Sequence, residues 1–231
     1  MSDIYSMFRK ATCFAGFRTL LFLTAFLFFS TVDGSYAGDA STITSDKMKI
    51  VSKGEVSDFT GNVELIHKNL TINSDEMKLY EKAGDAFAEG NIYIHYSSGS
   101  AVTNVWGDTA KYNKNTGNGL VSGNVKIKRE LTPGATDVIN MTCNELEILD
   151  FGDRLHAIKN VKILKMDVDA SGSEAFYEHK TNEILLVGKP ATIKKTEGKT
   201  TSEYSGNRVH IDVKTETVTI SGSVKTKVVL K

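Results

Sequence analysis

A single pattern that occurs six times constrains the fold of this chain more than any other feature. Each copy begins with a small residue, two polar residues and an apolar-x-apolar triplet, and continues to a Gly-Asn-Val-like block. The first blocks start at Ser45, Ser74, Gly107, Cys143, Gly172 and Gly206, and the second blocks centre on Asn62, Asn91, Asn124, Asn160, Lys189 and Ser223. The two blocks are always 17 positions apart, whereas successive copies are 29 to 36 positions apart. A fixed interval inside each copy predicts a hairpin of constant geometry, and the variable interval predicts surface turns between hairpins.

Residues within each copy alternate between apolar and polar. Val63 and Leu65 follow one second block, and Ile92 and Ile94 follow the next. A period of two predicts strands with one apolar face and one wet face. Turns are expected at residues 52–54, 82–84, 113–117 and 151–153, which are rich in residues that tolerate positive φ.

The small residues of both blocks lie in the middle of the expected strands. Glycine in a strand interior usually marks a bulge or a bend, so each hairpin is expected to be creased. The sequence therefore predicts an all-β fold, a twisted open β-jelly roll or solenoid of about six creased antiparallel hairpins with an apolar interior. Strands expected at residues 43–51 and 223–230 would leave unpaired edges at both ends, which favour head-to-tail partners.

The first 37 residues differ in kind from the repeats. Arg9, Lys10 and Arg18 precede an apolar run at residues 20–29, and small residues at positions 35 and 37 fit a signal-peptidase site. We interpret residues 1–37 as a secretory signal and residues 38–231 as a single β-jelly-roll domain. A retained N-terminal membrane anchor is the alternative, although the apolar run is about half the roughly 20 residues of a spanning helix.

Charge and cysteine content narrow the functional classes. Lys and Arg together number 28, as do Asp and Glu. This balance predicts no nucleic-acid partner, because such partners usually require a basic surface. Cys13 would leave with the signal, so Cys143 has no cysteine with which to pair and is expected to be a buried small side chain without a reactive role.

The sequence offers no convincing catalytic, metal or cofactor site. The five histidines, which we expect to be solvated or incidental, occupy different repeat phases and do not predict a zinc site. They are His67, His95, His156, His179 and His210. Asp46, Asp75 and Asp108 share one repeat position that other copies fill with Asn or Ser, which favours a bend over paired catalytic carboxylates. We therefore expect no enzyme activity and no cofactor.

Two groups of residues allow more than one interpretation. The first group is basic, and we expect it on outward or turn positions, with contact to lipid phosphates or sugars as the alternative. It consists of Lys126, Lys128, Arg129, Lys194, Lys195 and Lys199. The second is the aromatic pair Trp106 and Tyr112, which we expect in the core, with the lip of a groove as the alternative.

The repeated motifs resemble those of the LptA and OstA-like lipopolysaccharide-transport family. The similarity is carried by Ile43-Thr44-Ser45-Asp46, Phe59-Thr60-Gly61-Asn62-Val63-Glu64-Leu65, Leu70-Thr71-Ile72-Asn73-Ser74-Asp75, Gly188-Lys189-Pro190-Ala191-Thr192-Ile193 and Thr219-Ile220-Ser221-Gly222. It extends from about residue 41 to the C-terminus. Each motif is short, but six copies in register behind a secretory signal are together fairly specific.

The resemblance implies a periplasmic protein that carries lipopolysaccharide from the inner to the outer membrane by binding lipid A acyl chains in an apolar groove. It also implies inner-membrane and outer-membrane partners bound through the edge strands, and head-to-tail homo-oligomers. The expected groove residues are Ile43, Leu65, Ile72, Met77, Leu79, Ile92, Ile94, Val125, Ile127, Ile193, Ile211 and Val213. Alternatives are a membrane-anchored LptC-like component of the same system, or a structural β-solenoid whose interior is filled by its own side chains.

Overall fold

The computed structural model describes residues 40–230, apart from residues 100, 131–137 and 167. These residues belong to one compact unit, Gly38–Lys231, and the expected signal sequence lies outside the described residues. The strands within this part are β1 (Ser41–Thr44), β2 (Lys47–Val51), β3 (Val56–His67), β4 (Leu70–Tyr80), β5 (Asp85–Ser98), β6 (Ala101–Asn113), β7 (Asn118–Glu130), β8 (Val138–Leu149), β9 (Arg154–Lys165), β10 (Val168–Glu178), β11 (Glu183–Glu197), β12 (Thr200–Asp212), β13 (Thr217–Ser221) and β14 (Lys225–Leu230). Two 3-10 turns, η1 (Ser52–Gly54) and η2 (Asp150–Gly152), lie where the sequence predicts turns.

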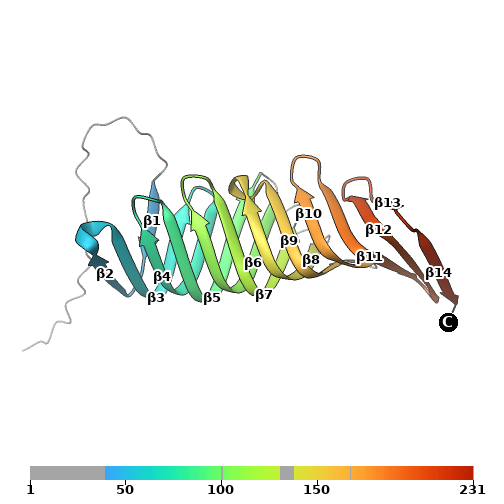
Figure 1. Cartoon of the computed structure of the whole chain (residues 1–231), viewed down its shortest axis with the longest axis horizontal. Helices are drawn as coiled ribbons and strands as arrows, with labels where there is room; N and C mark the ends of the chain where they lie inside the picture. The colour runs from blue at the N-terminus through green and yellow to red at the C-terminus, as the bar shows by residue number, and fades with distance from the viewer. Residues whose placement is uncertain (1–39, 100, 131–137, 167, 231) are drawn as a thin grey trace, which may run out of the picture. The chain divides into compact units, whose positions relative to one another are not determined.

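The strands form one antiparallel sheet in which chain neighbours are also sheet neighbours, from β3 through β12 (Figure 1). β1 and β2 both pair with β3, and β13 and β14 both pair with β12, so each end of the sheet is a strand divided in two. The predicted all-β jelly roll of six creased hairpins is confirmed by this arrangement. None of the helical segments in the described residues is long and apolar enough to span a membrane.

The crease is a β-bulge that recurs in each hairpin. Between β4 and β5 the pairing breaks after Asn73 and resumes at Glu76, opposite the second block of that repeat. In that block Gly90 has φ +76° and Asn91 has φ +47°, values in the left-handed region that glycine and asparagine tolerate best. The bulge therefore favours these residue types, which explains why the block recurs, although Lys159 and Asn160 adopt the same left-handed conformation in β9.

A side-chain bond across the crease in four of the six copies helps to fix the interval between the two blocks. Asn91 donates its amide to the Asp75 carboxylate over 2.8 Å. The equivalent bonds run from Asn62 to Asp46 (2.9 Å), from Asn124 to Asp108 (3.2 Å) and from Asn160 to Asn144 (3.3 Å). The aspartates therefore act at the bend, as predicted, and a residue inserted between the blocks would separate the two partners.

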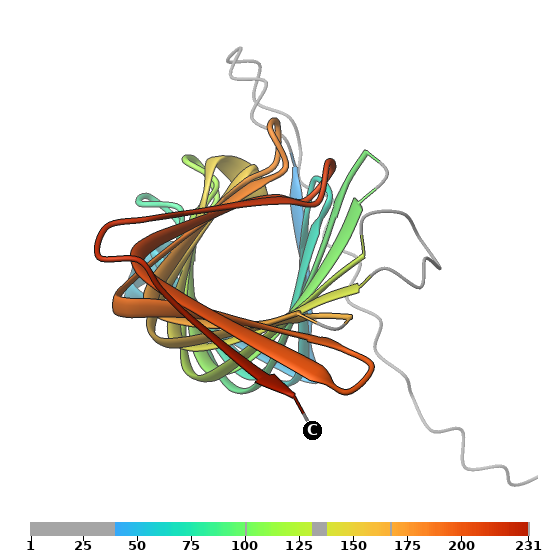
Figure 2. The ribbon, with the colours of Figure 1, turned by 90° about the vertical axis from the view of Figure 1, so that its right-hand side faces the viewer.

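The crease divides each long strand into two halves that face one another (Figure 2). We call the half-strands that meet at turns such as η1 and η2 wall 1, and the half-strands on the other side of the crease wall 2. The inward residues of both walls form one apolar core, in which Leu146, Leu186, Val125 and Val209 are fully buried. The free ends of the two walls approach each other along a line opposite the crease, which we call the seam.

Three expectations about individual side chains are wrong. Arg129 is buried (3% exposed) and not outward, because it has the same alternation phase as the inward residues Val125 and Ile127. His67 is buried for the same reason in β3, so it is not a solvated histidine. Trp106 lies on the outer face with 39% of its surface exposed, whereas Tyr112 is in the core as expected.

Candidate functional site

The expected groove residues fall into two groups in the structure. Those from β3 to β7 lie in the closed core, each no more than 6% exposed: Leu65, Ile72, Met77, Leu79, Ile92, Ile94, Val125 and Ile127. On the inner face, two very small spaces lie beside them, about 10 Å³ near Ile72 and Ile94 and about 20 Å³ near Ile127. Ile43, on the first edge, is half-buried against the same core.

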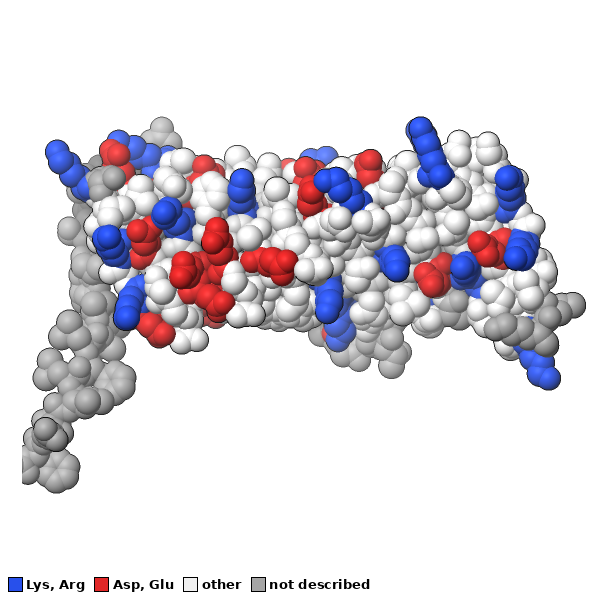
Figure 3. All heavy atoms as spheres, turned by 60° about the horizontal axis from the view of Figure 1, so that its bottom comes forward, with Lys and Arg blue, Asp and Glu red and all other residues white. Residues whose placement is uncertain are grey.

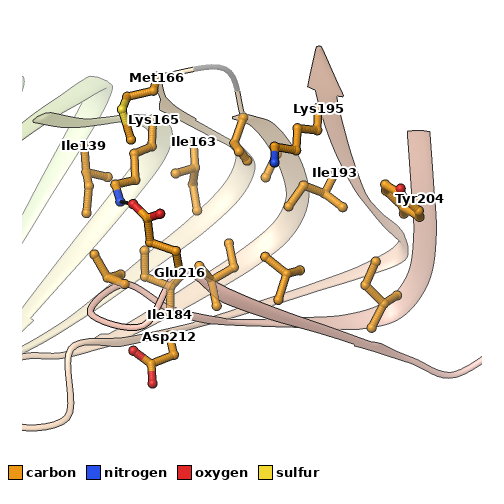
Figure 4. A pocket seen from close by; sticks show the side chains of 16 residues that line it. Ile139, Ile163, Lys165, Met166, Ile184, Ile193, Lys195, Tyr204, Asp212 and Glu216 are labelled. Atoms are coloured by element: carbon orange, nitrogen blue, oxygen red, sulfur yellow. Dashed lines mark hydrogen bonds and ion pairs between the residues drawn. The ribbon is translucent and has the colours of Figure 1, made fainter. Parts of the chain in front are cut away.

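The second group lines a cavity between the walls near the C-terminal end of the sheet. Its volume is about 530 Å³, and Ile193, Ile211 and Val213 contribute to its lining. The other lining residues are Ile139, Ile163, Lys165, Met166, Val168, Ala170, Ile184, Lys195, Tyr204, Asp212, Glu216, Val218 and Ile220. Figure 4 shows side chains from both walls directed into this space. Most of the lining is aliphatic, so the cavity suits an apolar guest.

Differences in side-chain size explain why the interior is open here and closed elsewhere. In the middle of the sheet, Tyr96, Tyr112 and Tyr177 are inward and buried, and they fill the space beside the seam. At the C-terminal end, inward positions near the seam hold smaller residues such as Val168 and Val213. The aromatic rings take up space that these aliphatic side chains leave empty.

Contacts across the seam hold the two walls together in the closed part. The His67 ring nitrogen Nδ1 lies 2.7 Å from the Tyr112 hydroxyl, and burial raises the pKa of that tyrosine to about 12. Further along, the Arg129 guanidinium bonds to His179 at 2.8 Å and lies 4.5 Å from the centre of the Tyr177 ring. Burial also raises the pKa of Tyr177. These contacts join wall 2 to wall 1 without enclosing a sizeable space.

The seam beside the cavity is bridged differently, by charged groups that are partly in water. Lys165 on wall 2 and Glu216 on wall 1 form an ion pair of 3.3 Å, and Figure 4 shows their charged groups directed toward each other. Lys195 forms an ion pair of 2.5 Å with Glu197. Hydrogen bonds from the backbone and hydroxyl of Thr215 lower the pKa of Asp212, so this carboxylate is ionised at neutral pH. The cavity therefore has an apolar lining and a charged rim.

Three rim residues, Lys165, Asp212 and Glu216, were not expected in the site, and Lys195 was expected to contact lipid only under the alternative interpretation. The two lysines have a detectable signal in the sequence: Lys165 follows Val161 and Ile163 in the inward phase, and Lys195 follows Ala191 and Ile193. Strand alternation alone places these lysine side chains on the inner face, at the ends of their half-strands. Lys195 was expected to be outward or in a turn, and its place in the cavity lining corrects that expectation.

The charged side chains on one face of the molecule include both signs. Figure 3 shows basic and acidic side chains interspersed over one face, with a gathering of acidic residues in its left half. No continuous basic patch crosses the part of this face that the structure describes. Within residues 40–230, gaps excepted, no three His, Cys, Asp or Glu side chains are placed to hold a metal ion.

Cys143 lies at the crease of β8 and is buried (5% exposed), as expected from its small-residue position. Burial raises the pKa of its thiol to about 11.

Comparison with known proteins identifies the family. The family model described as "LptA/(LptD N-terminal domain) LPS transport protein" matches residues 42–105 and 104–217. Among solved structures the chain is similar to LptH, described as the LptA homologous periplasmic component of the conserved lipopolysaccharide transport device from Pseudomonas aeruginosa. That similarity has 12% sequence identity and a TM-score of 0.33, and it covers 65% of this chain and 83% of LptH. Among curated proteins none matches this sequence. Since the family model covers most of the chain, the protein belongs to the LPS transport family of LptA and the LptD N-terminal domain.

Proposed function

We propose that this protein is a periplasmic carrier of lipopolysaccharide that binds lipid A acyl chains in the C-terminal cavity. The observation that carries the proposal is an aliphatic cavity of about 530 Å³ in a member of an LPS transport family. Its volume falls within the roughly 300–1,000 Å³ of typical ligand pockets. The periplasmic location rests on the secretory signal expected in residues 1–37.

The lining supplies enough binding energy without any polar recognition. Burial of a methylene gives about 0.8 kcal/mol, so ten methylenes give roughly 8 kcal/mol before the cost of ordering the chain. Many unspecific contacts of this kind tolerate acyl chains of different length. Such a site binds and releases lipid and requires no covalent chemistry.

The charged rim supports the orientation of the lipid. Lys165 and Glu216 bridge the seam, where one side of the cavity meets the surface. Charged groups are strongly disfavoured in apolar surroundings, so the polar head of the lipid would lie at this rim while its acyl chains lie inside. The aliphatic lining and the charged rim thus match the two parts of a glycolipid.

The two ends of the sheet support assembly into a bridge. β1 and β2 pair only with β3, and β13 and β14 pair only with β12, so each edge leaves one row of backbone groups for another chain. Both edges expose apolar side chains, including Met48 and Ile50 at one end and Val228 at the other. We propose that copies of this chain join head to tail through these edges, and that the same edges bind the inner-membrane and outer-membrane components.

The cavity lies next to the second edge, which favours transfer between joined chains. Tyr204 and Ile211 of β12 and Val218 and Ile220 of β13 line it. A strand added to the β13–β14 edge would therefore extend the cavity wall into the next subunit. This arrangement would let an acyl chain pass along the bridge without entering water.

Photo-crosslinking tests the lipid site directly. A benzophenone amino acid at Ile193 points into the cavity, whereas one at the neighbouring Lys194 points outward and is the matched control. We expect saturable, light-dependent capture of lipopolysaccharide at Ile193 only. Capture at neither position, or equal capture at both, would contradict the proposed site and favour a structural role.

A capping experiment tests assembly. Ile50→Asp and Val228→Asp each place a charge on one edge of the sheet. We expect each variant to block growth of the head-to-tail oligomer at that edge. The two variants mixed in equal amounts should form dimers through their intact edges, as measured by light scattering. If both variants still formed long oligomers, these edges would be ruled out as the contacts between subunits.

A further inference from the structure

A second hollow lies on the outer face of wall 2, separate from the cavity between the walls. It has a volume of about 610 Å³ and is formed by β6, β7 and β8 close to the crease. We call it the outer groove, and its lining residues are Trp106, Gly107, Asp108, Asn124, Lys126, Ile127, Lys128, Asn140, Met141 and Thr142. The inner cavity shares none of these residues, so the lipid site does not account for the groove.

An aromatic side chain forms one side of the outer groove. Trp106 is 39% exposed and packs on Tyr93, with ring centres 5.5 Å apart and planes tilted by 37°. The Tyr93 hydroxyl donates to the Asn104 side-chain oxygen over 2.9 Å, which fixes the supporting ring. The indole is therefore held in place with part of its surface open.

Polar and cationic groups lie directly beside the indole. Lys126 is opposite Trp106 in the strand register, and Thr142 is opposite Lys126. Lys126 forms no ion pair with any described residue, whereas the neighbouring Lys128 is paired with Glu130 at 2.8 Å. The side chains of Asn140 and Thr142 are exposed on the same face. The groove thus combines an aromatic surface, hydrogen-bonding groups and an available ammonium group.

We propose that the outer groove binds a saccharide that carries a carboxylate or phosphate. A pyranose ring has an apolar C–H face that packs on an indole, and its hydroxyls bond to amides and hydroxyls such as those of Asn140 and Thr142. The acidic substituent pairs with the Lys126 ammonium in a charge-assisted bond. Most residues that line the groove are polar or charged, so it suits a sugar better than an acyl chain.

Two sources could supply such a saccharide, and the chemistry of the groove is the same for both. One is the acidic sugar portion of lipopolysaccharide, and the other is the carboxylate-bearing glycan of the cell wall. The proposal does not rest on the inner cavity. Its tests therefore use soluble sugars without acyl chains.

Trp106 is the only tryptophan of the chain, so its fluorescence reports on the groove directly. The full-length exported protein would be titrated with deacylated lipopolysaccharide oligosaccharide, with N-acetylglucosaminyl-N-acetylmuramic acid, and with neutral N,N′-diacetylchitobiose. We expect a saturable fluorescence change with at least one acidic sugar. The acidic probe that binds identifies the source, and either result supports the proposal.

Variants separate the groove from the rest of the surface. We expect Lys126→Gln to weaken binding of the acidic sugar about tenfold in the fluorescence assay, because one charge-assisted bond is lost. Trp106→Ala removes the fluorescent group, so its binding would be measured by calorimetry. We expect its affinity for the acidic sugar to fall about tenfold, because the sugar loses its stacking surface. Phe176→Ala removes a similarly exposed ring from wall 1 and is the matched control, which should bind normally.

Three results would overturn the proposal: no saturable change with either acidic sugar, equal binding of the neutral sugar, or loss of binding in Phe176→Ala as large as in Trp106→Ala. Circular dichroism of each variant would establish that the sheet is intact. Failure of these tests would leave lipid binding at Ile193 unaffected, so the two proposals fail separately.

Discussion

Replacing Gly90 by alanine would test how the crease is built. Gly90 has φ +76°, and a Cβ atom at this position would lie 2.3 Å from Asp75 Oδ2 and 2.9 Å from its Cγ. The left-handed backbone costs alanine about 1 kcal/mol relative to glycine. The clash displaces the carboxylate from Asn91, which costs about 1–1.5 kcal/mol more for the lost hydrogen bond. We therefore expect Gly90→Ala to lower the free energy of unfolding by about 2–2.5 kcal/mol.

For a domain of this size that loss corresponds to a fall in Tm of roughly 4–10 °C, measurable by circular dichroism at the sheet band. Gly198→Ala is the matched control, because Gly198 has φ +57° but no atom within 4 Å of the added Cβ. It should lose only the backbone contribution of about 1 kcal/mol. In an Asp75→Ala background the two closest clashing atoms are gone, so Gly90→Ala should cost less than in the native chain.

Equal loss of stability in Gly90→Ala and Gly198→Ala would refute this reasoning, as would unchanged cost in the Asp75→Ala background. Either result would mean that the carboxylate moves aside freely and that the Asp-Asn bond does not hold the crease.

Four further predictions concern the interior. Ile193→Trp should weaken lipopolysaccharide binding on the order of tenfold in a displacement assay. The larger side chain excludes two or three methylenes of the lipid from the cavity, at about 0.8 kcal/mol each. The control Lys194→Trp, whose side chain points outward, should change binding little. The Cys143 thiol, with a pKa raised by burial from 9.0 to about 11, should resist maleimide at pH 7–8 until urea unfolds the chain. Burial likewise raises the pKa of Tyr112 from 10.0 to about 12. The stability that each of these protonated groups contributes is complete below its unfolded-state pKa and is lost as the pH rises through its folded-state pKa. We therefore expect the urea midpoint of unfolding to fall above about pH 9–10. Tyr112→Phe should cost about 1–3 kcal/mol by chemical denaturation, because the buried His67 nitrogen loses its hydroxyl partner, and no change would contradict the seam contact.

The fold could be predicted because the repeats constrain it in two independent ways. The constant interval between blocks reflects a bond between specific residues, such as Asp75 and Asn91, which tolerates no insertion. The alternation of residues such as Ile92 and Ile94 fixes which face is buried. Both signals are local in sequence, so no knowledge of distant contacts was needed to predict creased hairpins.

The site was harder to predict because its extent depends on contacts between walls. Alternation places Ile72 and Ile193 on the same inner face, yet one lies in closed core and the other lines the cavity. The difference comes from side chains that reach across from the opposite wall, dozens of residues away in sequence. No local pattern in a single strand shows how far the side chains of the opposite wall extend into the interior, which is why a groove along the whole sheet was expected.

The residues that close the interior share a property that hid them in the sequence. His67 and Arg129 end half-strands in the inward phase, but ionisable residues are normally assigned to the surface. At the end of a half-strand the inner face meets the seam, where a polar group can bond to the opposite wall, as Arg129 does to His179. At these positions the alternation phase of the strand therefore predicts burial better than the residue type does, because a strand cannot turn one side chain outward without shifting its register.

The same position in the strand has opposite consequences in the middle of the sheet and near its C-terminal end. Where the inward residue at the seam meets an aromatic ring, as Arg129 meets Tyr177, the walls are joined through buried groups and the interior is full. Where it meets a flexible carboxylate, as Lys165 meets Glu216, the pair stays partly in water and leaves a cavity behind it. The capacity of this β-roll for a lipid is thus set by a few residues at the seam, while the repeated apolar residues provide a lining common to its open and closed parts.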